Sequence, residues 1–140
     1  MRELAVDLFN RVWGYMDDPE RTARETQLMI HAAHASRHHW EEAGGPVNHA
    51  RGEWQISRAY TVARRAEPAL HHAVLCLETA EQHDLGPFDL ACAHEALARA
   101  HALAGDGERS AHHVTLARDV AARIEDPEER QVVLDDLATI

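Results

Sequence analysis

Apolar side chains recur at spacings of three and four residues along most of the chain. Two stretches carry this spacing clearly: Leu70, Ala73, Val74, Leu77 and Ala80 in one, Leu97, Ala100 and Ala104 in the other. Such a period places the apolar side chains on one face of an α-helix. No stretch alternates apolar and polar residues as a half-buried strand would. The pattern therefore predicts an all-α fold.

Residues that stop or start helices divide the chain into seven segments. The clearest breaks are Gly44-Gly45-Pro46, Gly86-Pro87 and Gly105-Asp106-Gly107. Asp18-Pro19 and Asp126-Pro127 each place a capping carboxylate before a proline that fits the first helical turn. The predicted helices span residues 2–17, 20–43, 48–65, 67–85, 88–104, 107–124 and 127–139. Their connections are short, so consecutive helices are expected to lie antiparallel.

The chain also repeats itself at an offset of 41 residues. Residues 50–85 align with residues 91–126, and nine of the 36 positions are identical. The identical pairs are Ala50/Ala91, Arg58/Arg99, Ala59/Ala100, Ala63/Ala104, Glu67/Glu108, His71/His112, His72/His113, Leu75/Leu116 and Ala80/Ala121. An alanine-rich composition gives roughly three identities by chance. The alignment favours two similar helix pairs, the alternative being coincidence between two amphipathic pairs.

Small residues and a turn fall at regular places in the second copy. Leu97-Ala98 provides a small contact residue, His101 lies where Tyr60 lies in the first copy, and Gly105-Asp106 forms the turn. This arrangement resembles the tetratricopeptide repeat (TPR), in which small side chains let two helices cross closely. In the first copy, Arg64-Arg65 replaces the Gly-Asp turn.

The resemblance covers about residues 50–126, and its period is longer than the usual 34 residues. It implies stacked antiparallel helix pairs in a TPR-like right-handed superhelix with about seven helices. On this interpretation residues 1–140 form a single TPR-like domain. A degenerate helix pair at 2–47 would precede two repeats at 48–126 and a capping helix at 127–140.

Composition and charge narrow the possible partners. The formal net charge of −10 argues against nucleic-acid binding and against anionic membrane surfaces, both of which need a basic face. All 14 basic residues are arginine, which is typical of a GC-rich bacterial genome.

No apolar stretch reaches the length of a membrane span. Cys76 and Cys92 lie within helical patterns and are interpreted as reduced thiols of a cytoplasmic protein.

In TPR proteins the first helix of each pair lines a concave groove that binds peptides. The resemblance places Arg51, Trp54 and Arg58 from the first copy in this groove, with Glu95 and Arg99 from the second. Two guanidinium groups beside an indole could clamp a carboxylate or phosphate of a partner protein. The alternative is that Arg58 and Arg99 pair with Glu95 and leave a solvated groove.

Histidines suggest a second kind of site. His31, His34, His38 and Glu41 share one face of the predicted helix 20–43, and such side chains suit Zn²⁺, Ni²⁺ or Cu²⁺. They could equally hydrogen-bond to the next helix or lie in solvent. The sequence contains no His-Glu-x-x-His motif and no zinc-finger spacing of cysteines.

No nucleophile elbow, phosphate-binding loop or dinucleotide fingerprint is present, so an enzyme is the least favoured class. Trp13 and Trp40 are expected in the core. Leu75 and Leu116 are expected to face outward on adjacent helices, where they could form a homodimer contact. The sequence thus predicts an adaptor that binds a peptide or acidic segment of another protein and needs no cofactor.

Overall fold

The computed structural model describes residues 1–140, and its helices are joined by short turns with no strand, as predicted. The seven helices are α1 (Arg2–Met16), α2 (Ala23–Ala43), α3 (Pro46–Val62), α4 (Ala66–Gln82), α5 (Pro87–Leu103), α6 (Gly107–Ala121) and α7 (Pro127–Leu137). None of them combines the length and the apolar composition that a membrane-spanning helix needs.

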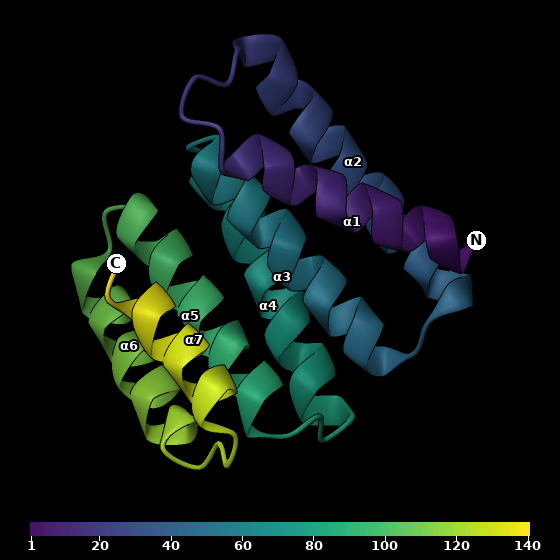
Figure 1. The fold of residues 1–140 in the computed structure, drawn as a ribbon. Helices are drawn as coiled ribbons and strands as arrows, with labels where there is room; N and C mark the ends of the chain where they lie inside the picture. The colour runs from purple at the N-terminus through teal and green to yellow at the C-terminus, as the bar shows by residue number, and fades with distance from the viewer.

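Consecutive helices pair as hairpins. The closest packing joins α1 with α2, α3 with α4, and α5 with α6, and α7 lies against both α5 and α6. Figure 1 shows the pairs arranged in chain order, with α7 over the last pair. The odd-numbered helices also contact one another in sequence, α1 with α3, α3 with α5, and α5 with α7. These four helices therefore share one face of the protein.

The predicted start of α2 at residue 20 is wrong by three residues. Thr22 is the cap: its hydroxyl accepts from the Glu25 N–H at 3.1 Å, and the Glu25 carboxylate accepts from the Thr22 N–H at 3.2 Å. This reciprocal capping box satisfies two free amides at once. The carboxylate of Asp18 instead accepts from the N–H of Glu20 and closes a turn before the helix.

The predicted start of α3 at residue 48 is wrong by two residues. The helix begins at Pro46, whose ring occupies the first turn, and the Asn48 side chain accepts from the Gly45 N–H at 3.1 Å. Proline occupies the same first position in α5, at Pro87, and in α7, at Pro127. Because proline has no N–H to leave unpaired there, it begins a helix without loss.

The turn within each central helix pair has the same backbone form in both copies. Arg64 has a φ of 62° and Gly105, 41 residues later, has a φ of 82°. In each turn the next residue donates its N–H to the carbonyl oxygen five residues earlier, at 2.9 Å in both. Left-handed backbone favours glycine, so Arg64 occupies its position against a steric cost. The two turns therefore share the same backbone form although their sequences differ.

Replacing Arg64 with glycine is expected to raise the free energy of unfolding by up to about 1 kcal/mol, because it removes the Cβ from a left-handed residue. The reverse change, Gly105→Arg, is expected to lower it by about the same amount. Urea unfolding measures both changes. Arg64→Ala is the control, because it removes the same side chain but keeps a Cβ on the left-handed residue. A destabilised Arg64→Gly variant would contradict this account.

Alanine is the commonest buried residue and lets the helices approach closely. Five alanines of α5 alone are almost fully buried: Ala91, Ala93, Ala96, Ala98 and Ala100. Helix α5 consequently packs against α3, α4, α6 and α7. Trp40 is 6% exposed, which confirms its predicted place in the core. Leu75 and Leu116 are half-buried rather than fully outward.

Candidate functional site

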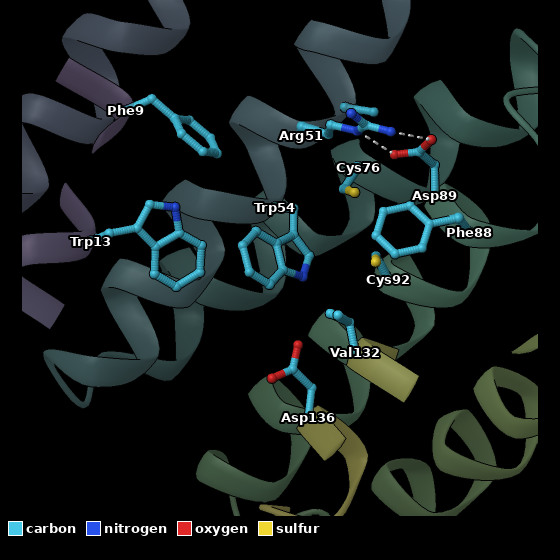
Figure 2. A pocket seen from close by; sticks show the side chains of 11 residues that line it. Phe9, Trp13, Arg51, Trp54, Cys76, Phe88, Asp89, Cys92, Val132 and Asp136 are labelled. Carbon is cyan, nitrogen blue, oxygen red and sulfur yellow. Dashed lines mark hydrogen bonds and ion pairs between the residues drawn. The ribbon is translucent and has the colours of Figure 1, made fainter. Parts of the chain in front are cut away.

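A cavity of about 340 Å³ opens on the face that α1, α3, α5 and α7 share (Figure 2). It is lined by Phe9, Trp13, Ala50, Arg51, Trp54, Cys76, Phe88, Asp89, Cys92, Val132 and Asp136. All four odd-numbered helices contribute side chains, and α4 adds the thiol of Cys76. The cavity therefore depends on the packing of residues that lie far apart in the sequence.

Four aromatic rings line the cavity, those of Phe9, Trp13, Trp54 and Phe88. The rings of Trp13 and Trp54 lie side by side, with centroids 5.5 Å apart and planes tilted by 39°. Phe9 meets Trp13 edge to face at 6.4 Å, and Phe88 lies across the cavity (Figure 2). Aromatic surfaces of this kind bind apolar groups with a large burial of area. Trp13 was predicted as a core residue, but it is half-buried and lines the cavity.

An ion pair closes one end of the cavity. Arg51 of α3 donates from Nε and Nη2 to the two carboxylate oxygens of Asp89 on α5, at 2.9 and 3.3 Å. The guanidinium also lies over the ring of Phe88, 5.6 Å from its centroid. The hydrogen bond to Asp89 raises the pKa of Arg51. This fork-to-fork pairing fixes the charge of Arg51 within the protein.

Glu95 is the centre of a second charged group, beside the indole of Trp54. Its carboxylate is 2% exposed and accepts from Trp54 Nε1 at 3.1 Å, Arg99 Nε at 2.9 Å and Arg58 Nη1 at 3.4 Å. Arg99 also donates from Nη2 to the backbone oxygen of Asp136 at 2.9 Å. One buried carboxylate therefore holds two guanidiniums and links α3, α5 and α7.

Four residues at successive offsets of 41 form a row across the odd-numbered helices. Trp13, Trp54, Glu95 and Asp136 occupy α1, α3, α5 and α7 in turn. Burial and the neighbouring Glu95 carboxylate raise the pKa of Asp136. The Asp136 carboxylate points towards the two indoles in Figure 2. The row combines an aromatic half and an acidic half on one face.

The structure places the five predicted groove residues in two neighbouring groups. Arg51 and Trp54 line the cavity, whereas Arg58, Glu95 and Arg99 form the ion network beside it. Both guanidiniums bind Glu95, which is the second of the two arrangements expected from the sequence. The structure therefore presents no pair of free guanidiniums for an acidic ligand.

Sequence reasoning missed the contributions of α1 and α7 and of Phe88 on α5. Phe9, Phe88, Val132 and Asp136 were not among the candidate residues, although they line the cavity. The 41-residue offset between Trp13 and Trp54 was a signal that could have placed Trp13 beside the groove.

No known protein family matches this chain. No curated protein and no solved structure is detectably similar to it either.

The predicted metal ligands do not converge. His34 Nε2 lies 2.9 Å from the hydroxyl of Tyr60, and Glu41 accepts from Arg37 Nη1 at 2.7 Å. His31 and His38 are exposed on α2. No group of three or more histidine, cysteine or carboxylate side chains in the protein has the arrangement that a metal ion requires. The hypothesis that His31, His34, His38 and Glu41 form a metal site is therefore not supported.

Other histidines pack as stacked rings between helices, in the same way in both copies. His72 lies over Tyr60 at 5.9 Å and 14°, and His113 lies over His101 at 5.6 Å and 6°. His113 also places its Nδ1 3.1 Å from Nδ1 of His94. Only one proton can occupy that contact. Burial and the neighbouring His94 accordingly lower the pKa of His113 to about 4.

Three potential nucleophiles of the chain, Ser36, Ser57 and Cys76, are hydrogen-bonded or neutral. The Ser36 hydroxyl donates to the backbone oxygen of Ala5, and the Ser57 hydroxyl to that of Ala69, each at 2.8 Å. Burial raises the pKa of the Cys76 thiol, which faces the cavity in its neutral form. These groups tie helices together or line the cavity, and none is activated for attack.

Proposed function

We propose that the protein is a TPR-like adaptor of the cytoplasm that receives a segment of a partner protein on the face of the odd-numbered helices. The observation that carries this proposal is the aromatic cavity of about 340 Å³ beside Trp54. Its volume falls at the lower end of the range for ligand pockets and is large enough to admit one large side chain. A partner would insert such a side chain as its anchor, as buried aromatic anchors do in other interfaces.

The charge arrangement favours an apolar anchor over a carboxylate. For an acidic segment to bind Arg58 and Arg99, these guanidiniums would have to leave Glu95, whose carboxylate is 2% exposed. That exchange would leave the buried carboxylate of Glu95 without a partner, which is strongly unfavourable. An apolar side chain entering beside Trp54 requires no such exchange.

Binding suits the site better than catalysis. The cavity is lined mainly by aromatic and aliphatic groups, and its Arg51 and Asp89 side chains are bonded to each other. The Cys76 thiol is neutral, as its raised pKa indicates. Such a lining buries an apolar group but offers no activated nucleophile, and its remaining carboxylate, Asp136, lies 4.0 Å from Arg58 Nη2.

Blocking the cavity mouth tests the proposal. Val132 of α7 lines the cavity and is 52% exposed, so Val132→Trp extends a ring over the opening without disturbing the core. Peptides selected by the wild-type protein from a random dodecapeptide phage library are expected to bind this variant at least tenfold more weakly. Isothermal titration with the synthetic peptides measures the change.

Leu134→Trp is the matched control. Leu134 is an exposed residue of the same helix and does not line the cavity, so this variant is expected to keep wild-type affinity. Thermal unfolding of both variants checks that the fold is retained. Peptides that bind the Val132→Trp variant as tightly as wild type, or a library that yields no binder, would remove the proposal.

A further inference from the structure

A second, more open hollow of about 700 Å³ adjoins the aromatic cavity. It shares Arg51, Phe88 and Asp89 with that cavity. Its remaining lining is Leu85, Pro87, Arg123, Ile124, Glu125, Asp126 and Glu129. The hollow thus lies between the start of α5 and the start of α7. The cavity and the hollow therefore meet at Arg51, Phe88 and Asp89, and one bound segment can reach both.

The charges of this hollow are unbalanced. Arg51 and Asp89 neutralise each other through their two hydrogen bonds. Of the other side chains, Glu125, Asp126 and Glu129 are acidic, Arg123 is the single base, and none of the four forms an ion pair. Among the lining side chains outside the Arg51–Asp89 pair, three carboxylates therefore face one base.

The overall charge of the protein agrees with this excess. The whole chain carries a formal net charge of −10, so a basic partner is attracted at long range as well. The aromatic cavity and the acidic hollow together suit a ligand that has an apolar part and a cationic part.

We propose that the bound segment carries an arginine or lysine beside its apolar anchor, and that the basic side chain lies in the hollow lined by Glu125, Asp126 and Glu129. This inference rests on the proposed function, because it describes the segment that the cavity receives. The anchor supplies buried apolar area, whereas the basic residue supplies specificity and faster association. An acidic segment would meet repulsion at the same place.

The composition of selected peptides gives the first test. Dodecapeptides selected from the random library are expected to carry a large apolar residue with arginine or lysine within about four residues, the reach of a segment spanning adjoining hollows. Replacing that arginine with citrulline, or the lysine with norleucine, removes the charge and nearly keeps the size. We expect this replacement to weaken binding about fivefold in low salt and less at high salt.

Paired variants of the protein give the second test. Glu125→Gln with Glu129→Gln removes two charges from the hollow, and Asp126 is left unchanged because it caps α7 by accepting from the Glu128 N–H at 2.9 Å. This double variant is expected to bind the charged and the neutral peptide alike. The control, Glu128→Gln with Asp135→Gln, removes two exposed charges elsewhere on α7 and is expected to keep the fivefold preference.

The outcomes separate this inference from the proposed function. Selected peptides that depend on the cavity but show no basic preference, or an acidic one, would overturn the inference and leave the adaptor proposal standing. A basic preference that both double variants lose equally would assign the effect to overall charge and would also overturn it. Absence of any peptide sensitive to Val132→Trp would remove both proposals.

Discussion

Replacing Glu95 with alanine is expected to lower the free energy of unfolding by about 3–5 kcal/mol. The change leaves Arg58 and Arg99 without their shared carboxylate and leaves the indole N–H of Trp54 without its acceptor. Since Glu95 is 2% exposed, water cannot readily replace it. A loss of this size would reduce the melting temperature by about 10–15 °C in a domain of this length.

Urea unfolding followed by circular dichroism measures the effect of Glu95→Ala. Glu95→Gln keeps the shape and an acceptor for Trp54, so a smaller loss is expected. Glu41→Ala is the surface control, because Glu41 pairs with Arg37 at an exposed position of α2, and its unfolding midpoint should not move. A Glu95→Ala variant as stable as the Glu41→Ala variant would mean that the ion network does not support the fold.

Acidification from pH 7 to pH 4.5 is expected to destabilise the protein through its stacked histidines. The pKa of His113 is about 4 in the folded protein and about 6.5 in the unfolded chain, so the unfolded state binds the proton first. The contribution of His113 to the free energy of unfolding is fully present above pH 6.5 and is lost as the pH falls towards 4. Allowing for the partial exposure of His113, its contribution is about 1–2 kcal/mol. Burial also lowers the pKa of His94 and of His101, which act in the same direction.

Urea unfolding at several pH values tests this expectation. His113→Phe keeps a ring against His101 but cannot take up a proton, so it should lose about 1–2 kcal/mol of the pH dependence. His38→Gln is the control, since His38 is exposed on α2 and lies outside the stacked rings. Equal pH dependence in His113→Phe and wild type would show that the lowered pKa has no bearing on stability.

The helices were predictable because their signals are local. Hydrophobic spacing, together with Gly86-Pro87 and Asp126-Pro127, located the segments to within a few residues. The errors arose where two local signals competed, as when Asp18-Pro19 suggested a start that the Thr22 capping box takes instead. At Arg64 the sequence lacks the expected glycine, yet the repeated packing holds the same turn.

The site was only partly predictable, because its properties depend on distant contacts. The sequence indicated that Arg58 and Arg99 lie at equivalent places, but it could not decide whether they face a ligand or Glu95. That choice depends on the burial of Glu95 between α3 and α7, which no single helix determines. The aromatic cavity likewise needs Phe9 and Phe88, whose helices meet only through α3.

The row formed by Trp13, Trp54, Glu95 and Asp136 has a consequence for how this protein can evolve. Each member of the row contacts or faces the next member on the neighbouring odd-numbered helix. A change of size or charge at one of them therefore alters the surroundings of its neighbours in the row. In related chains, correlated substitutions should therefore appear at separations of 41 residues. Compensation within a helix, at three or four residues, would be weaker at these positions.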